Sequence, residues 1–358
     1  MEHPLATFYR GKTVLVTGHT GFKGGWLAAW LKLLGARVIG YALEPDTEPN
    51  LFRVAAIADG MVSLRGDIRD LDAVTTAFRR YPPDIVIHNA AQALVRRSYR
   101  APVETYETNV MGTVHVLEAA RQTPSVRAIV VVTSDKCYQN RDESTGYQES
   151  DPLGGYDPYS SSKACAELVT AAYRQSFAAE RQGLGIASAR AGNVIGGGDW
   201  AEDRLVPDLV RGIASGSPVT IRRPDAVRPW QHVLEPLRGY LQLAHCLWQH
   251  GPAYAGPWNF GPRDEDAITV ADLARRLIAR WGEGQLTIQP NPEAPHESSS
   301  LRLDTTKARS RLGWHPVLDL DQALAWSAEW YRAYYRNPAS AGTGLDAQIE
   351  RAMQTVPV

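Results

Sequence analysis

The sequence predicts an α/β fold, in which a doubly wound parallel sheet carries helices on both faces and the C-terminal part of the chain forms a smaller lobe. In the first half, short apolar runs alternate with amphipathic stretches of helix length, the pattern of successive βαβ units. After about Gly192 this alternation stops, and glycine and proline clusters interrupt the chain. The length of 358 residues suits about two domains.

Six apolar runs are expected to form the strands, at residues 13–17, 37–41, 61–64, 84–88, 127–133 and 186–190. Helices are expected at residues 21–34, 71–80, 103–121 and 159–179. We therefore expect residues 1–190 to form the sheet domain, with segments near 228–262 returning to it, and residues 191–358 to form the smaller lobe. Residues 338–344 are expected to be a loose loop before a short terminal helix.

The composition is that of a globular enzyme, with 44% hydrophobic and 22% charged residues. The formal net charge of −1 gives no basic footprint, so neither nucleic acid nor an anionic membrane is expected as a partner. The chain shows no signal peptide, no spanning apolar run and no cysteine pattern for a metal or for disulfides. These features predict a cytoplasmic protein without a bound metal.

A glycine-rich turn links the first strand to the first helix. The run Thr17-Gly18-His19-Thr20-Gly21-Phe22-Lys23-Gly24 holds three glycines at three-residue spacing. Such a turn lets the backbone approach a pyrophosphate, and the helix N-terminus offers free amides to it. The same spacing also occurs in tight turns without a ligand, but its place at the first βα junction favours a dinucleotide and a Rossmann-type sheet. The expected contacts are Gly18, Thr20, Gly21, Phe22, Lys23 and Gly24.

Later strand ends supply further candidate cofactor contacts, although each could equally be an ordinary loop. They are Asp67 and Ile68 after the third strand, Asn89, Ala90 and Ala91 after the fourth, and Thr133 at the end of the fifth. Thr108, within the helix expected at 103–121, is a further candidate. No arginine follows the second strand directly, and the first carboxylate, Glu44, comes three residues after it. The pattern therefore favours NAD over NADP without deciding between them.

Tyr159 and Lys163 lie four residues apart at the start of a predicted helix, so their side chains share a face. Such a pair is often only a solvated surface, but here it follows a cofactor turn. A nearby ammonium would move the tyrosine pKa toward neutrality, where the phenol can act as a base. The run Thr133-Ser134-Asp135-Lys136 ends the fifth strand, where ligands of doubly wound sheets bind, and predicts further catalytic groups.

At these residues the chain resembles the extended short-chain dehydrogenases that act on nucleotide sugars, over almost its full length. More specific runs resemble the CDP-glucose 4,6-dehydratase branch. They are Gly18 to Gly24, Thr133 to Tyr138, Gly155-Tyr156-Asp157-Pro158-Tyr159, Arg190 to Trp200 and Arg228-Pro229-Trp230-Gln231-His232-Val233.

The resemblance implies an internal redox cycle with NAD in a homodimer or homotetramer. Tyr159, assisted by Lys163, takes the O4 proton while hydride leaves C4, and Ser134 hydrogen-bonds the oxygen. Asp135 protonates the departing O6, and the hydride returns to C6. In the dTDP-glucose branch a glutamate follows this aspartate as the C5 base, whereas here Lys136 stands in its place. A neutral Lys136 could be the base, or a charged one could stabilise the enolate.

The resemblance also implies substrate contacts at Gln92, Ser134, Asn193, Arg204, Leu205, Arg228 and His296, with Glu297 as a weaker candidate. Arginine suits a diphosphate because its planar fork binds two oxygens, although surface arginines would look the same in sequence. Trp200 and Trp230 fit the core better than a role in stacking on a base.

Two other functions remain compatible with the scaffold. One is a nucleotide-sugar 4-epimerase or reductase, which would have no need of an acid such as Asp135 to expel O6. The other is a cofactor-binding regulator without turnover, which would be expected to have lost the Tyr159–Lys163 pair.

Overall fold

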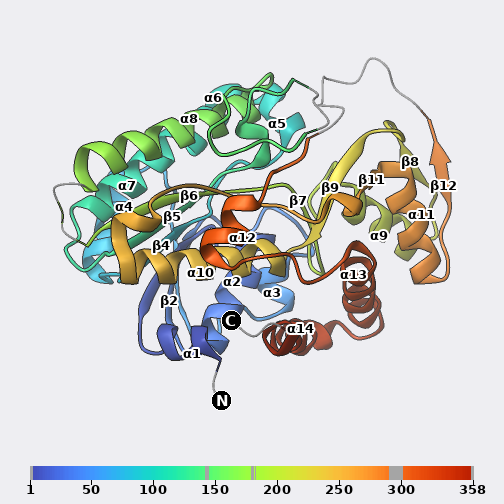
Figure 1. The fold of residues 1–358 in the computed structure, drawn as a ribbon. Coiled ribbons are helices and arrows are strands. Elements are labelled where there is room, and N and C mark those ends of the chain that lie inside the picture. The colour runs from blue at the N-terminus through green and yellow to red at the C-terminus, as the bar shows by residue number, and fades with distance from the viewer. Residues whose placement is uncertain (1–2, 142–144, 179–180, 182, 290–300, 356–358) are drawn as a thin grey trace.

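A seven-stranded, wholly parallel sheet forms the centre of the structure (Figure 1). The computed structural model describes residues 3–141, 145–178, 181, 183–289 and 301–355. The strand order is β10-β6-β5-β4-β1-β2-β3. The strands are β1 (Thr13–Thr17), β2 (Arg37–Ala42), β3 (Val62–Arg65), β4 (Ile85–His88), β5 (Ala128–Val132), β6 (Gly185–Ala191) and β10 (Gly256–Phe260). The predicted doubly wound parallel sheet is confirmed.

Helices cover both faces of this sheet, and the strands contribute buried apolar side chains to a core on each face. Along β4, Ile85 and Ile87 face one core and Val86 faces the other, as the two-residue period of a strand requires. The first core includes α2 (Phe22–Leu33) and α10 (Leu234–His250), and the second includes α4 (Leu71–Arg80) and α7 (Gly112–Arg121). Figure 1 shows α7 and α8 (Pro158–Tyr173) on the side of the sheet opposite α2 and α10.

Two small sheets lie outside the central one. One contains β7 (Asn193–Ile195), β9 (Val227–His232) and β11 (Ala267–Thr269), and the other contains β8 (Val219–Ile221) and β12 (Leu286–Ile288). Around them lie α9 (Leu205–Ser215), α11 (Val270–Trp281) and α13 (Leu320–Arg336). The chain returns to the central sheet at β10, a strand that the sequence pattern did not single out. The division into two domains stays a prediction.

The remaining elements are short helices at the edges and loops. They are α1 (Pro4–Tyr9), α3 (Leu51–Val54), α5 (Val95–Arg100), α6 (Pro102–Tyr106), α12 (Thr306–Leu312) and α14 (Ala341–Thr355), with the single turns η1 (Glu107–Met111), η2 (Asp135–Cys137), η3 (Arg174–Ala178), η4 (Gly251–Tyr254), η5 (Asp264–Asp266) and η6 (Pro338–Ser340). The helix expected at residues 103–121 is interrupted by the π turn η1. No helix among the described residues is long and apolar enough to cross a membrane.

The prediction of a loop at residues 338–344 is wrong for residues 341–344, which are helical. Asn337 caps a 3-10 turn that leads directly into α14, which begins at Ala341. The glycines that suggested a loop serve packing instead. A side chain at Gly342 would approach the Ala55 carbonyl at 3.3 Å, and one at Gly344 would approach the Trp330 ring at 3.4 Å.

Candidate active site

The predicted site residues that directly follow strands lie at one edge of the central sheet, because β1, β4, β5 and β6 are parallel and end there. The glycine-rich turn follows β1, Asn89 follows β4, Ser134 follows β5 and Gly192 follows β6. The structure therefore brings together residues that lie more than 170 positions apart in the sequence.

The glycine-rich turn has the geometry that the spacing predicted. Gly18 adopts a φ of +76°, and a Cβ there would lie 2.8 Å from the Cα of Ala90. A Cβ at Gly24 would lie 2.0 Å from the carbonyl oxygen of Gly18, so only glycine lets α2 start this close to the turn. Gly21 caps α2 without a side-chain hydrogen bond. The first amides of the helix are therefore available to an anion.

The other residues of the turn have partners within the fold. The Thr20 hydroxyl donates to the carbonyl of Leu43 at 2.9 Å, and Phe22 packs against the core. The Lys23 ammonium lies 3.5 Å from the Tyr240 hydroxyl. Burial lowers the pKa of Lys23 to about 7, and the positive charges of Lys163 and Arg204 act in the same direction.

His19 is a member of this turn that the sequence interpretation did not consider. Its ring lies against Gly40, where a Cβ would come within 2.3 Å of it, and it hydrogen-bonds Ser63 at 2.8 Å. Burial, together with the charge of Arg65, lowers its pKa to about 4. The glycine in the middle of the second strand was the sequence signal for this close approach.

The candidate cofactor contacts after β3 and β4 differ in their burial and in whether the fold already supplies partners for their polar groups. The Asp67 carboxylate pairs with Arg69 at 2.6 Å, which lowers the pKa of Asp67. Ile68 is buried, and Thr108 lies half-buried in the π turn η1. The amides of Asn89 and Ala90 both donate to the Thr17 hydroxyl at 3.1 Å. Ala91 is half-buried beside them.

Ser134, Asp135 and Lys136 lie in a tight turn rather than in an extended strand. The Ser134 hydroxyl accepts from the amide of Lys136 at 3.2 Å and donates to Asp135 at 2.9 Å. Asp135 is 3% exposed, and a Cβ at Gly192 would lie 3.0 Å from its carboxylate. Burial raises the pKa of Asp135, although Lys136, Ser134 and Arg228 oppose the rise. The carboxyl group is thus shifted toward the protonated form that a general acid needs.

Tyr159 and Lys163 are positioned by the start of α8. Asp157 caps this helix by accepting from the amide of Ser160 at 2.9 Å, and Pro158 occupies its first turn. Both side chains are buried, and the Lys163 ammonium donates to the carbonyl of Val132 at 3.2 Å. Burial lowers the pKa of Lys163 to about 8, which Glu167 partly opposes.

The expected shift of the Tyr159 pKa toward neutrality is wrong for the protein alone. Burial raises the pKa of Tyr159 to about 12, and the charges of Asp135 and Asp157 add to the rise. A hydrogen bond with Ser134 and the charge of Arg204 act in the opposite direction. Desolvation therefore outweighs the cationic surroundings that the helix spacing had suggested.

Two of the candidate substrate contacts lie near enough to this centre for their charges to act on it, Arg204 on Tyr159 and Arg228 on Asp135. Arg204 forms an ion pair with Asp199 at 2.9 Å, and the charge of Asp199 raises the pKa of Arg204. Arg228 is buried on β9. Asn193 begins β7, and Leu205 packs against the core at the start of α9.

The remaining candidate residues differ in whether the structure describes them and in whether their side chains already have partners. The Gln92 side-chain amide already bonds Leu94 and Thr105, and the Thr133 hydroxyl donates to Glu167 at 2.5 Å. His296 and Glu297 lie outside the described residues. Trp200 and Trp230 belong to the hydrophobic core, as expected, and Trp200 packs edge-on against the Trp330 ring.

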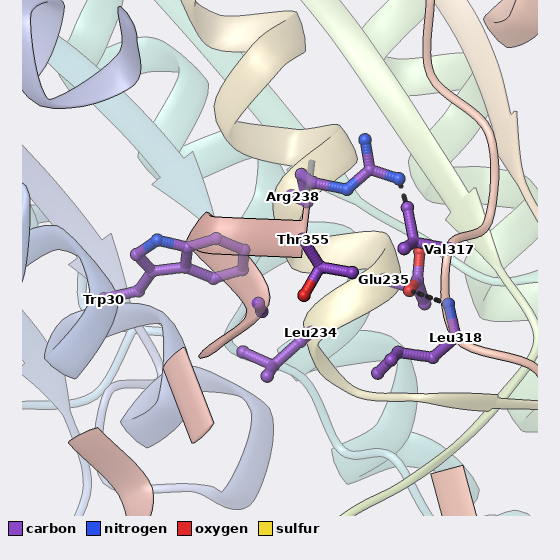
Figure 2. A pocket seen from close by; sticks show the side chains of 8 residues that line it. Trp30, Leu234, Glu235, Arg238, Val317, Leu318 and Thr355 are labelled. Carbon is purple, nitrogen blue, oxygen red and sulfur yellow. Dashed lines mark hydrogen bonds and ion pairs between the residues drawn. The ribbon is translucent and has the colours of Figure 1, made fainter. Parts of the chain in front are cut away.

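A small separate hollow lies between α10 and α14, and Figure 2 shows it. It is lined by Trp30, Leu234, Glu235, Arg238, Val317, Leu318, Ala352 and Thr355, and no predicted site residue is among them. Glu235 pairs with Arg238 at 3.3 Å and accepts from the amide of Leu318 at 2.9 Å. This hollow is not a part of the candidate active site.

Among the described residues, no group of His, Cys, Asp or Glu is placed to hold a metal ion.

Comparison with known proteins identifies the family. Residues 15–326 match the model of the GDP-mannose 4,6-dehydratase family. The chain belongs to this family. Within it, the chain is 51% identical to a CDP-glucose 4,6-dehydratase of Salmonella typhimurium, over 92% of this chain and 93% of that protein. It is 30% identical to a dTDP-glucose 4,6-dehydratase of Streptomyces niveus, over 89% and 92% of the two chains.

Solved structures of related enzymes have the same fold. A UDP-glucose 4-epimerase of Thermus thermophilus in complex with NAD matches with a TM-score of 0.78 at 27% identity, over 89% of this chain and 99% of that one. A dTDP-glucose 4,6-dehydratase of Streptomyces venezuelae with NAD bound matches with a TM-score of 0.76 at 28% identity, over 89% and 97%. The scaffold is therefore shared by dehydratases and epimerases, and the site residues must distinguish them.

Proposed function

We propose that this protein is an NAD-dependent hydro-lyase that converts CDP-glucose to CDP-4-dehydro-6-deoxyglucose. The observation that carries the proposal is the Ser134-Asp135-Lys136 turn beside Tyr159, in a chain 51% identical to a CDP-glucose 4,6-dehydratase. A 4-epimerase needs only to remove and return a hydride at C4. A buried acid with a raised pKa next to the tyrosine is the additional group that expulsion of O6 requires.

The turn after β1 fits a dinucleotide cofactor. Its left-handed Gly18, the closeness of Gly18 to Gly24 and the uncapped start of α2 leave space and free amides for a pyrophosphate. Gly18, Gly21 and Gly24 would hold it, with Lys23 near its anionic groups. Bound NAD would accept a hydride from C4 of the sugar and return it to C6.

The side chains of the protein would divide the remaining chemistry. Tyr159 takes the proton from O4, and Ser134, which hydrogen-bonds Tyr159, stabilises the same oxygen. The 4-ketone makes the C5 proton acidic, Asp135 protonates the departing O6, and Lys136 either removes the C5 proton or stabilises the enolate. Arg204 and Arg228 bind the diphosphate. Asp199 holds Arg204 in place for this purpose.

Purified protein should therefore remove one water from CDP-glucose without net consumption of NAD. Incubation with CDP-glucose, dTDP-glucose and GDP-mannose, followed by mass spectrometry, tests both the reaction and the nucleotide preference. Loss of two hydrogens with stoichiometric NADH would contradict the proposal, and so would a product of unchanged mass, which would indicate a 4-epimerase.

We also infer that the enzyme is a homodimer or homotetramer that acts in the cytoplasm. Large apolar side chains are exposed on neighbouring helical segments, namely Val103 on α6, Met111 on η1, Leu168 on α8 and Phe177 on η3. A second copy of the chain would cover them. Sedimentation of the parent and of Leu168→Glu tests the assembly.

The three cysteines are free, as suits a reducing compartment.

A further inference from the structure

A buried ion pair lies directly behind the turn that carries Asp135 and Lys136. Glu167 on α8 and Arg190 on β6 meet at 2.8 Å, and each side chain is only 3% exposed. Neither belongs to the predicted catalytic set. Burying an ion pair is costly unless further hydrogen bonds satisfy both charged groups. The residues that hydrogen-bond Glu167 and Arg190 therefore indicate which segments the ion pair fixes in place.

The carboxylate of Glu167 fixes the start of the turn. It accepts from the Thr133 hydroxyl at 2.5 Å and from the Ser188 hydroxyl at 2.6 Å. Thr133 is the last residue before Ser134, and Ser188 lies on the neighbouring strand β6. One carboxylate therefore ties the end of β5 to β6 immediately before the chain turns toward the site.

The guanidinium of Arg190 fixes the end of the turn. It donates to the Tyr138 hydroxyl at 2.7 Å and lies over the Tyr138 ring, 4.7 Å from its centroid. The same hydroxyl donates to Asn259 on β10 at 2.7 Å. Tyr138 comes directly after η2. The two members of the ion pair thus hold the residues on either side of the segment 134–137.

The pair is also linked to the helix that carries the base. Tyr159, Lys163 and Glu167 are spaced four residues apart and so lie along one face of α8. The negative charge of Glu167 opposes the lowering of the Lys163 pKa by burial. Glu167 therefore connects the helix that carries the base to Thr133, the residue directly before the turn that carries the acid.

We propose that the Glu167–Arg190 pair positions the 134–137 turn, holding Asp135 and Lys136 at a fixed place relative to Tyr159. The inference rests on the proposed dehydration, and it assigns Glu167, Arg190, Tyr138 and the Thr133 hydroxyl as positioning residues. Catalytic groups need supporting contacts of this kind, because small displacements of an acid or a base cost rate. Tyr159 sits on α8 itself, so loosening the far end of the turn disturbs elimination more than oxidation.

Tyr138→Phe is the decisive variant, because it removes the hydroxyl that Arg190 holds and keeps the ring. Tyr147→Phe is the matched control, because its ring stacks on Tyr138 with centroids 5.1 Å apart. Its hydroxyl donates to Asn140 and accepts from the amide of Arg141, and within the described part of the chain it makes no bond to Arg190. Single-turnover experiments with CDP-glucose follow cofactor reduction by absorbance and water loss by mass spectrometry. In Tyr138→Phe, water loss should slow about tenfold or more while cofactor reduction keeps its rate, so that reduced cofactor accumulates.

The start of the turn is tested by Thr133→Val, which removes the hydroxyl bond to Glu167, and by Thr133→Ser, which retains it. Water loss should slow in the valine variant and recover in the serine variant. Parental rates of water loss in Tyr138→Phe would overturn the inference, as would an equal slowing of both steps in Tyr138→Phe and Tyr147→Phe. A parent enzyme that removes no water would overturn the proposed function and this inference together, whereas the other outcomes leave the proposed function intact.

Discussion

The hydroxyl of Ser134 donates a hydrogen bond of 2.9 Å to the carboxylate of Asp135. The same side chain hydrogen-bonds Tyr159, which partly opposes the rise that burial causes in the pKa of that phenol. One hydroxyl group therefore links the residue proposed for oxidation at C4 to the residue proposed for elimination at C6. Because the two steps use different side chains, substitutions should separate them.

Tyr159→Phe should block the first hydride transfer while leaving NAD binding close to that of the parent. The phenylalanine ring fills the same space, but it cannot accept the O4 proton, so cofactor reduction should slow by about 100-fold or more. Absorbance of the bound cofactor after addition of CDP-glucose measures the step, and calorimetric titration with NAD measures the binding. Normal turnover in this variant would remove Tyr159 from the mechanism.

Asp135→Asn should still oxidise C4 but stall before water is lost. An amide has almost the size of the carboxyl group, yet it cannot protonate O6. The variant should therefore hold reduced cofactor and a 4-keto hexose that still carries its 6-hydroxyl. Mass spectrometry of the quenched complex identifies this sugar. Formation of the deoxy product at the parental rate would show that another residue is the acid.

Lys136→Met and Lys136→Arg should distinguish the two possible roles of this lysine. If Lys136 removes the C5 proton, both variants lose elimination, and deuterium from solvent no longer exchanges at C5. If its charge stabilises the enolate, the arginine variant retains much of the activity and the methionine variant does not. Exchange measured by mass spectrometry in deuterated buffer decides between them.

The sheet could be predicted from sequence because most of its strands contain a short, mainly apolar run between stretches of helix length, as Ile85 to Ile87 illustrates. Segments near 228–262 were expected to return to the sheet domain, but the strand β10 within them was not singled out, because Gly256-Pro257-Trp258 has no strand-like pattern. Its place beside β6 arises from packing over a long sequence distance. The helical start of α14 was missed because Gly342 and Gly344 serve close packing, which sequence alone does not distinguish from a turn.

Local spacing predicted the tight glycine-rich turn and placed Tyr159 and Lys163 at the start of one helix, and the structure has both features. The roles assigned to these residues stay predictions. The Tyr159 pKa was not predictable, because the depth of burial depends on the whole fold. The positioning role inferred for Glu167 was likewise hidden. Its spacing from Lys163 is visible in sequence, but the bonds to Thr133, Ser188 and Arg190 join three separate elements.

Two buried histidines should make the folded protein sensitive to mild acid. Burial lowers the pKa of His232 to about 3, and burial with the charge of Lys163 lowers that of His88 to about 3. Both are neutral in the folded protein, whereas the unfolded chain takes up protons near pH 6.5. Protons therefore favour unfolding below this pH, and each histidine should cost about 2 kcal/mol of stability between pH 7 and 5.

His232→Leu isolates one of these contributions, because the ring lies edge-on between Trp26 and Trp326 and its Nε2 has no hydrogen-bond partner among the described residues. Urea unfolding at pH 7 and pH 5 measures the free energy of unfolding of the parent and the variant. Whatever the variant's stability at pH 7, its loss on moving to pH 5 should be smaller than the parent's by about 2 kcal/mol. An equal loss in both proteins would mean that His232 is protonated in the folded state, which would contradict the burial-driven lowering of its pKa.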